Sequence, residues 1–230
     1  MSRIQFLSIL AIGATLLGGC DGLGRRQQGP VMEPARVAGA STQAGAATER
    51  AQSIRWDENT QEFEFAGKPL KAAKLWTFDR STDGFSMTGG QALLTSHSGL
   101  SVTQDAPDPI LRSPQGLDVD GAQNTLVLVR LTRAAPGQAW AGDVHYTTAS
   151  HGESAKYVAL PIQGEDPAVN ETTILVYDMA NLKKGGQDWI HSVIDQVRFD
   201  FEDQPGGEFL VRQVAIANNP DPAAIARLRR

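Results

Sequence analysis

Six side chains in the second half of the chain have the chemistry that a sugar-binding site needs. An arginine offers a planar fork of N–H donors, and a carboxylate accepts hydrogen bonds from two neighbouring hydroxyls. An aromatic ring provides an apolar platform against which a sugar ring can pack. The candidate ligand-binding residues are Arg130, Trp140, His145, Trp189, Arg198 and Asp200.

The positions of the polar candidates within apolar runs predict where they point. Successive side chains of a strand face opposite sides of the sheet. Arg130 follows Val129, and Arg198 and Asp200 flank Phe199. The polar residues, with Arg212 as a further candidate, are therefore expected on an outer face, opposite the core. They make one continuous face only if their strands adjoin.

Each candidate also has an ordinary structural interpretation. Arg130, Arg198 and Asp200 could pair with one another on a solvated sheet face, which would contribute about 1 kcal/mol or less. A tryptophan such as Trp140 or Trp189 often packs in a core or under a loop, and a strand histidine is often inert. The sequence leaves both interpretations open.

Short apolar segments between Gly-, Pro- and Asn-rich turns predict an all-β domain. Eight or more strands at this spacing indicate two packed antiparallel sheets, a β-sandwich. The residues expected in the core between the sheets are Val127, Val129, Leu131, Val144, Tyr146, Val197, Phe199 and Phe201. A hairpin is expected over residues 53–65, one helical turn within 178–184, and a frayed helical tail from residue 221.

The N-terminus has the pattern of a bacterial lipoprotein leader. A basic start precedes an apolar run that is shorter than the ~20 residues needed to span a bilayer. The run ends in Leu17-Gly18-Gly19-Cys20, which resembles a lipobox. The resemblance implies a signal peptide over residues 1–19, cleaved before Cys20, the only cysteine. It also implies a thioether-linked diacylglycerol on the Cys20 sulfur and usually a third acyl chain, such as palmitate, on its amine. An ordinary secretory peptide with a coincidental cysteine is the alternative.

The composition divides the rest of the chain into three parts. Residues 20–51 carry few large apolar side chains, so they predict a disordered N-terminal tether between the lipidated cysteine and the domain. Residues 52–217 form the predicted sandwich domain, and residues 218–230 a C-terminal tail. The formal net charge of −5 argues against nucleic acid as a partner.

A longer pattern resembles one family of sandwich domains. The stretch Asp108-Pro109-Ile110-Leu111-Arg112-Ser113-Pro114 leads into the apolar run at residues 125–130, and later segments follow at 189–190, 197–200 and 209–211. This order resembles the galactose-binding-like jelly-roll domains of carbohydrate-binding modules, over roughly residues 74 to 217. The resemblance implies a jelly roll that binds sugar on an outer sheet face or in the loops at one end.

The resemblance also raises the question of a metal. A structural Ca²⁺ is common in such domains, and the oxygen donors at strand ends are Asp79, Asp83, Asp178 and Asp200. No loop has the dense spacing of a calcium site, so no metal ligands are assigned and no cofactor is expected, with a structural Ca²⁺ as the alternative.

Enzyme signatures are missing from the sequence. It contains no nucleophile elbow, phosphate-binding loop or zinc-protease motif. Glu153 with Glu165 and Asp166 could be imagined as a glycosidase acid/base pair, but carboxylates in loops are usually only solvated. The chain is therefore expected not to be an enzyme.

Together these patterns predict a lipid-anchored protein of a bacterial membrane, with its domain facing the periplasm or the exterior. Its expected role is to hold or guide an envelope or exported polysaccharide. The alternative is a non-catalytic envelope assembly subunit that binds a protein partner. Exposed tryptophans beside Arg198 and Asp200 would favour the glycan, and a large apolar patch would favour the protein partner.

Overall fold

The computed structural model of the chain describes residues 53–229, all of which belong to one compact unit. Cys20, the predicted signal peptide at 1–19 and the predicted tether at 20–51 lie outside the described residues, so the structure does not test them. Within residues 53–229 no helix is long and apolar enough to cross a membrane.

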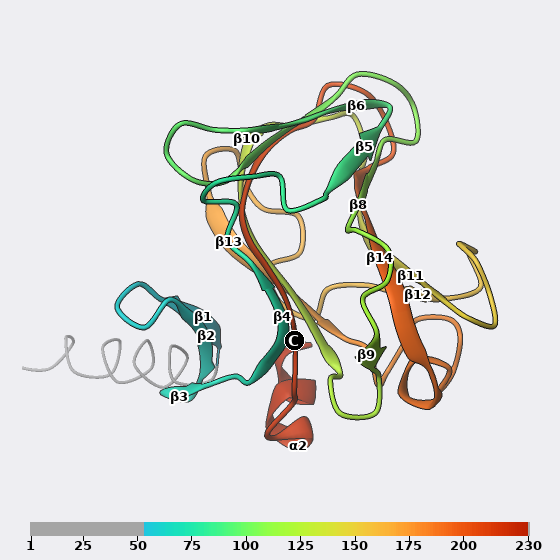
Figure 1. The fold of residues 1–230 in the computed structure, drawn as a ribbon. Coiled ribbons are helices and arrows are strands. Elements are labelled where there is room, and N and C mark those ends of the chain that lie inside the picture. Colours follow the sequence, from blue (N-terminus) through green and yellow to red (C-terminus); the bar gives the residue numbers. More distant parts are fainter. Residues whose placement is uncertain (1–52, 230) are drawn as a thin grey trace, which may run out of the picture. The chain divides into compact units, whose positions relative to one another are not determined.

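Two antiparallel sheets form the domain, as the alternation of apolar and polar residues predicts (Figure 1). Sheet I has the order β13-β10-β15-β7-β6, with β4 also paired to β15. Its strands are β4 (Ala72–Trp76), β6 (Gly90–Leu94), β7 (Leu100–Gln104), β10 (Leu126–Ala135), β13 (Thr172–Asp178) and β15 (Glu208–Ala217).

Sheet II has the order β12-β11-β14-β8-β5, with β9 also paired to β14. Its strands are β5 (Ser86–Thr88), β8 (Ile110–Arg112), β9 (Val119–Asp120), β11 (Trp140–Thr148), β12 (Val158–Ala159) and β14 (Val193–Glu202). From β10 to β15 the long strands alternate between the two sheets, so neighbours in sequence face each other across the core. The prediction of a two-sheet antiparallel sandwich is confirmed.

The main core lies between the sheets. Val129 of β10, Val144 and Tyr146 of β11, and Phe199 of β14 have no exposed surface, and they pack in one apolar cluster. All eight residues predicted for the core belong to this cluster. Burial of such side chains contributes about 1.5–3 kcal/mol each, which makes this cluster the main source of stability.

A second apolar cluster covers part of the outer face of sheet I. The small sheet of β1 (Ile54–Asp57), β2 (Glu62–Phe65) and β3 (Lys68–Pro69) lies over it and confirms the predicted hairpin. Ile54 and Phe63 pack there with Leu126 and Leu128, which alternate with the main-core residues of β10.

The first described strand is fastened by a glutamine side chain. Gln163 Oε1 accepts a hydrogen bond from the Ile54 amide (2.9 Å), and Gln163 Nε2 donates to the Ile54 carbonyl (3.0 Å). Gln163 is itself bridged to Val176 of β13. The start of β1 is therefore joined directly to sheet I.

Two local predictions are wrong. The C-terminal segment forms a short helix, α2 (Pro222–Ile225), and a 3₁₀ turn (Ala226–Leu228) in place of a frayed tail. Ile225 has no exposed surface and packs in the second cluster, which fixes the segment. The helical turn expected within 178–184 lies instead at Trp189–His191.

Candidate functional site

A row of basic side chains crosses three neighbouring strands of sheet II. In the strand register His145 of β11 lies opposite Arg198 of β14, and Arg198 lies opposite Arg112 of β8. The next pair on the same side is Asp143 with Asp200. The inward neighbours Leu111, Val144 and Phe199 are buried in the core, so this row belongs to the outer side of the sheet.

The two arginines are held by carboxylates. Arg198 donates to Asp200 through Nε (2.7 Å) and Nη2, a two-point ion pair within one strand. Arg112 donates to Glu153 through Nε and Nη2 (2.8 Å), and through Nη1 to Thr88 Oγ1 (2.8 Å). Because each guanidinium is bonded along an edge, its plane is fixed before any ligand arrives.

Glu153 joins the two arginines. Its Oε2 atom also accepts a hydrogen bond from Arg198 Nη1 at 3.2 Å, and Asp108 lies 3.5 Å from Arg198 Nη2. His145 completes the row, with Nε2 at 3.6 Å from Asp200 and Nδ1 at 3.4 Å from the Ser154 carbonyl oxygen. We call this group, Arg112, His145, Glu153, Arg198 and Asp200, the charged face.

The surroundings shift the pKa values of the two carboxyl groups of the charged face, and of the adjacent Asp143, in different directions. Hydrogen bonds from Arg112, with its charge and that of Arg198, hold the pKa of Glu153 below its usual value. Burial raises the pKa of Asp200, while the ion pair with Arg198 opposes that rise. Burial likewise raises the pKa of Asp143, which Lys183 and His145 oppose.

The protonation state of Glu153 bears on catalysis. A general acid must carry a proton at the working pH. Glu153 is ionised and paired with two arginines, so it lacks that proton at neutral pH. Of the other two carboxylates considered, Asp166 pairs with Arg133 (2.9 Å) and Glu165 lines a separate pocket, so neither belongs to the charged face. The geometry of the face suits binding through fixed donors and acceptors.

Three of the six predicted ligand-binding residues meet on this face: His145, Arg198 and Asp200. Arg130 does not, because β10 belongs to sheet I. It lies beneath the hairpin, where it donates to Glu58 (2.7 Å) and Gln213 (3.1 Å), with its guanidinium 6.0 Å from the Trp56 ring. Arg212, on β15, is likewise in sheet I. The prediction of one continuous face is wrong for these two residues, because consecutive long strands change sheet.

Neither predicted tryptophan forms a platform. Trp189 has no exposed surface, donates from Nε1 to the Asn124 carbonyl (2.9 Å) and packs edge-on against Tyr146. Trp140 is half-buried at the start of β11, packed against Phe209 and 5.3 Å from the Arg133 guanidinium. Counting back from the buried Tyr146 and Val144 in steps of two reaches Trp140, so its packing against the core follows the alternation of the strand.

Two members of the charged face were missed from sequence. Arg112 had a usable signal, because Leu111 is apolar and alternation places its neighbour on the outer side of the sheet. Glu153 had none, because it comes from the loop between β11 and β12 and reaches the arginines only through the path of that loop.

The four aspartates considered for calcium do not form a cage. Asp79 accepts from Thr77, Asp83 from Ser81, and Asp178 from Asn181, so each bonds within its own segment, while Asp200 pairs with Arg198. Within the described residues no three His, Cys, Asp or Glu side chains gather in a way that could hold a metal ion.

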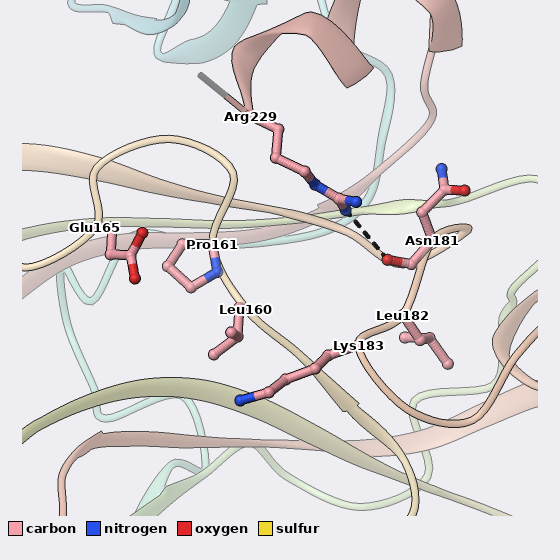
Figure 2. Close-up of a pocket in the computed structure, with 7 residues that line it drawn as sticks. All are labelled: Leu160, Pro161, Glu165, Asn181, Leu182, Lys183 and Arg229. Carbon is pink, nitrogen blue, oxygen red and sulfur yellow. Dashed lines mark hydrogen bonds between the residues drawn. The ribbon is translucent and has the colours of Figure 1, made fainter.

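A separate pocket lies beyond strand β12, with a volume of about 310 Å³ (Figure 2). Arg229 donates there to the Asn181 carbonyl at 3.2 Å. The pocket shares no residue with the charged face, although the charge of Lys183 acts on Asp143. Its lining residues are Leu160, Pro161, Glu165, Asn181, Leu182, Lys183 and Arg229.

No protein-family model matches the chain, and no curated protein matches it. Among solved structures it is similar to a family 29 carbohydrate-binding module from Piromyces equi, with 10% identity, 64% of this chain and 89% of that chain covered, and a TM-score of 0.42. A carbohydrate esterase of the Shiga toxin-encoding bacteriophage phi24B has 12% identity, 65% and 99% coverage, and a TM-score of 0.39. The xylan-binding module CBM86 from Roseburia intestinalis has 12% identity, 64% and 95% coverage, and a TM-score of 0.38. At these values the similarity carries no argument about function, and the sandwich rests on the coordinates of this chain.

Proposed function

We propose that this chain is a non-catalytic glycan-binding protein that a lipid on Cys20 anchors to a bacterial membrane. The charged face of sheet II is the proposed contact surface, and an envelope or exported polysaccharide the proposed ligand. The observation that carries this proposal is the row Arg112–Arg198–His145 across three neighbouring strands, with its guanidinium planes fixed by carboxylates.

The chemistry of the row supports a sugar. Each hydroxyl of a pyranose ring can both accept and donate hydrogen bonds. A guanidinium beside a carboxylate supplies the matching donors and acceptors. Charge-assisted hydrogen bonds contribute about 1.5–3 kcal/mol each, and preorganised groups lose little entropy on binding. Among the described residues no exposed tryptophan lies beside the face, so the proposed contact relies on hydrogen bonds.

One observation favours the alternative, an envelope assembly subunit that binds a protein partner. Leu75 of β4 and Leu93 and Leu94 of β6, all in sheet I, expose 39%, 58% and 38% of their surface. Exposed apolar side chains on one sheet are typical of protein contacts, but three residues offer little apolar area. The charged face therefore remains the preferred surface.

A glycan array with the full chain in detergent micelles, followed by calorimetry on the best ligand, tests the proposal. Arg198→Ala should weaken binding at least about tenfold, because it removes charge-assisted donors. The matched control is Arg55→Ala on β1, an exposed arginine paired with Glu64 on the hairpin. Equal affinity of wild type and Arg198→Ala would remove this face as the site, and an array without any ligand would favour the protein partner.

A further inference from the structure

We infer that the Arg112 guanidinium is a carboxylate-recognition site, and that Glu153 occupies it as an internal substitute for the carboxylate of an acidic sugar. The ligand class is then a uronate-containing polysaccharide. This inference rests on the proposed function, and it names the substrate class of the same face.

The contacts of Arg112 carry the first step. Its Nε and Nη2 atoms both donate to the Glu153 carboxylate, in the two-point geometry by which arginine recognises carboxylates. Its Nη1 atom donates to Thr88 Oγ1 on β5, so the fork is held by the sheet even without Glu153. Arg198 adds one more donor toward the same carboxylate.

Arg112 and Arg198 differ in the carboxylate that accepts their hydrogen bonds. Asp200, on the same strand as Arg198, takes two donors of that residue and is itself buried, so this pair belongs to the sheet. Glu153 comes from a loop, and about a quarter of its side chain is exposed. The Arg112 side chain is 22% exposed. The Arg112 fork is therefore the one that an incoming carboxylate can reach by displacing a loop residue.

The loop that carries Glu153 is held by contacts on both sides of it, while Gly152 and Glu153 themselves are exposed. His151 bonds to Asp188 (3.0 Å) and stacks on Tyr157, with ring centroids 3.8 Å apart. Within residues 53–229 the amides of Gly152 and Glu153 donate no backbone hydrogen bond, and a Cβ built on Gly152 would meet no atom within 4 Å. Glu153 can leave Arg112 by rotating its side chain, without unfolding the loop.

Competition by Glu153 has a measurable consequence. A tethered carboxylate is always present, so it lowers the apparent affinity for a free one. Glutamine keeps the shape of Glu153 but removes its charge, which leaves the charge of Arg112 unpaired. The gain expected for Glu153→Gln is about fivefold in affinity, the factor that matches one partly exposed ion pair.

The test uses the full chain in detergent micelles and two matched probes. One is an oligogalacturonate with free carboxylates, and the other is the same oligomer with its carboxylates methyl-esterified. Calorimetry compares wild type, Glu153→Gln and Arg112→Gln, with Glu62→Gln as the control. Glu62 is exposed on β2 of the hairpin sheet, and no ion pair within the described residues includes it. Thermal melts of each variant confirm folding.

Wild type should bind the acid form more tightly than the methyl-esterified form. Glu153→Gln should bind the acid form about fivefold more tightly than wild type does, with no gain for the esterified form. Arg112→Gln should remove the preference for the acid form, and Glu62→Gln should behave as wild type. The same affinity for both probes, no gain in Glu153→Gln, or no binding of the acid form overturns the inference. If neutral glycans still bind through Arg198, the proposed function survives that failure. If no glycan binds any variant, the proposed function fails as well.

Discussion

Replacing Glu202 by alanine should destabilise the domain strongly. The Glu202 side chain has no exposed surface, and its carboxylate accepts from Arg133 Nη2 and from the Gly137 amide (3.1 Å). The Arg133 side chain is only 9% exposed, so the substitution leaves a buried guanidinium with fewer partners. Breaking a buried ion pair in this way costs about 3–5 kcal/mol.

That cost converts into a shift of the melting temperature. A domain of this size loses about 2–4 °C for each kcal/mol, so Glu202→Ala should melt about 6–20 °C below wild type. Far-UV circular dichroism measures the melt, and urea titration at constant temperature gives the free energy of unfolding. The control Glu62→Ala, at an exposed position, should stay within about 0.5 kcal/mol of wild type.

A double variant tests the reason for the loss. Glu202 Oε2 and Arg133 Nε have no hydrogen-bond partner within the described residues, so the pair is incompletely satisfied. Replacing both residues with apolar ones, Arg133→Met with Glu202→Leu, should therefore recover most of the lost stability. A melting temperature of Glu202→Ala within about 3 °C of wild type, or a double variant that melts below Glu202→Ala, would refute the argument.

Three further results are expected. Cys20→Ser should abolish incorporation of radiolabelled palmitate, and equal labelling of both forms would contradict the lipoprotein assignment. Ile225→Ala should lower the free energy of unfolding by about 2–5 kcal/mol in urea, because its side chain is fully buried; an unchanged midpoint would mean that the C-terminal helix is not anchored. The pKa of Glu153 is lowered in the folded state, so its stabilising effect is present above its usual value of 4.5 and is lost as the pH falls through the lower folded value. Wild type should thus melt above Glu153→Gln at neutral pH, and the two should converge once the pH has fallen below the lowered folded pKa of Glu153; a gap that persists in strong acid would contradict this.

The sandwich could be predicted because burial on one side of a strand leaves a regular pattern. Val127, Val129 and Leu131 alternate with the residues on the outer side of β10, and all three lie in the main core. The outer side was less predictable. Leu126 and Leu128 lie on it and are buried by the hairpin, a contact between segments about seventy residues apart that local alternation does not encode.

The site was only partly predictable for a related reason. Alternation gives the side of a strand on which Arg130 and Arg198 lie, but not the sheet to which each strand belongs. The order of strands across the sheets placed β10 and β14 in different layers. Glu153 needed the path of a loop, which is a tertiary feature without a periodic signature. Trp140 could have been placed against the core, because it shares the parity of Val144 and Tyr146 on β11.

The Gln163 clamp on Ile54 has a mechanical consequence. The start of β1 and the end of β2 lie at the same end of their hairpin, since Ile54 pairs with Phe65. A pull on the chain ahead of Ile54 would therefore separate the Ile54–Phe65 pair first and then the remaining β1–β2 pairs one after another. A hairpin loaded in this way opens at low force. Two hydrogen bonds from Gln163 and the buried Ile54 side chain resist that first step and pass the load into β13 of sheet I. The domain is braced where an anchored chain would pull on it, while the charged face lies on the other sheet.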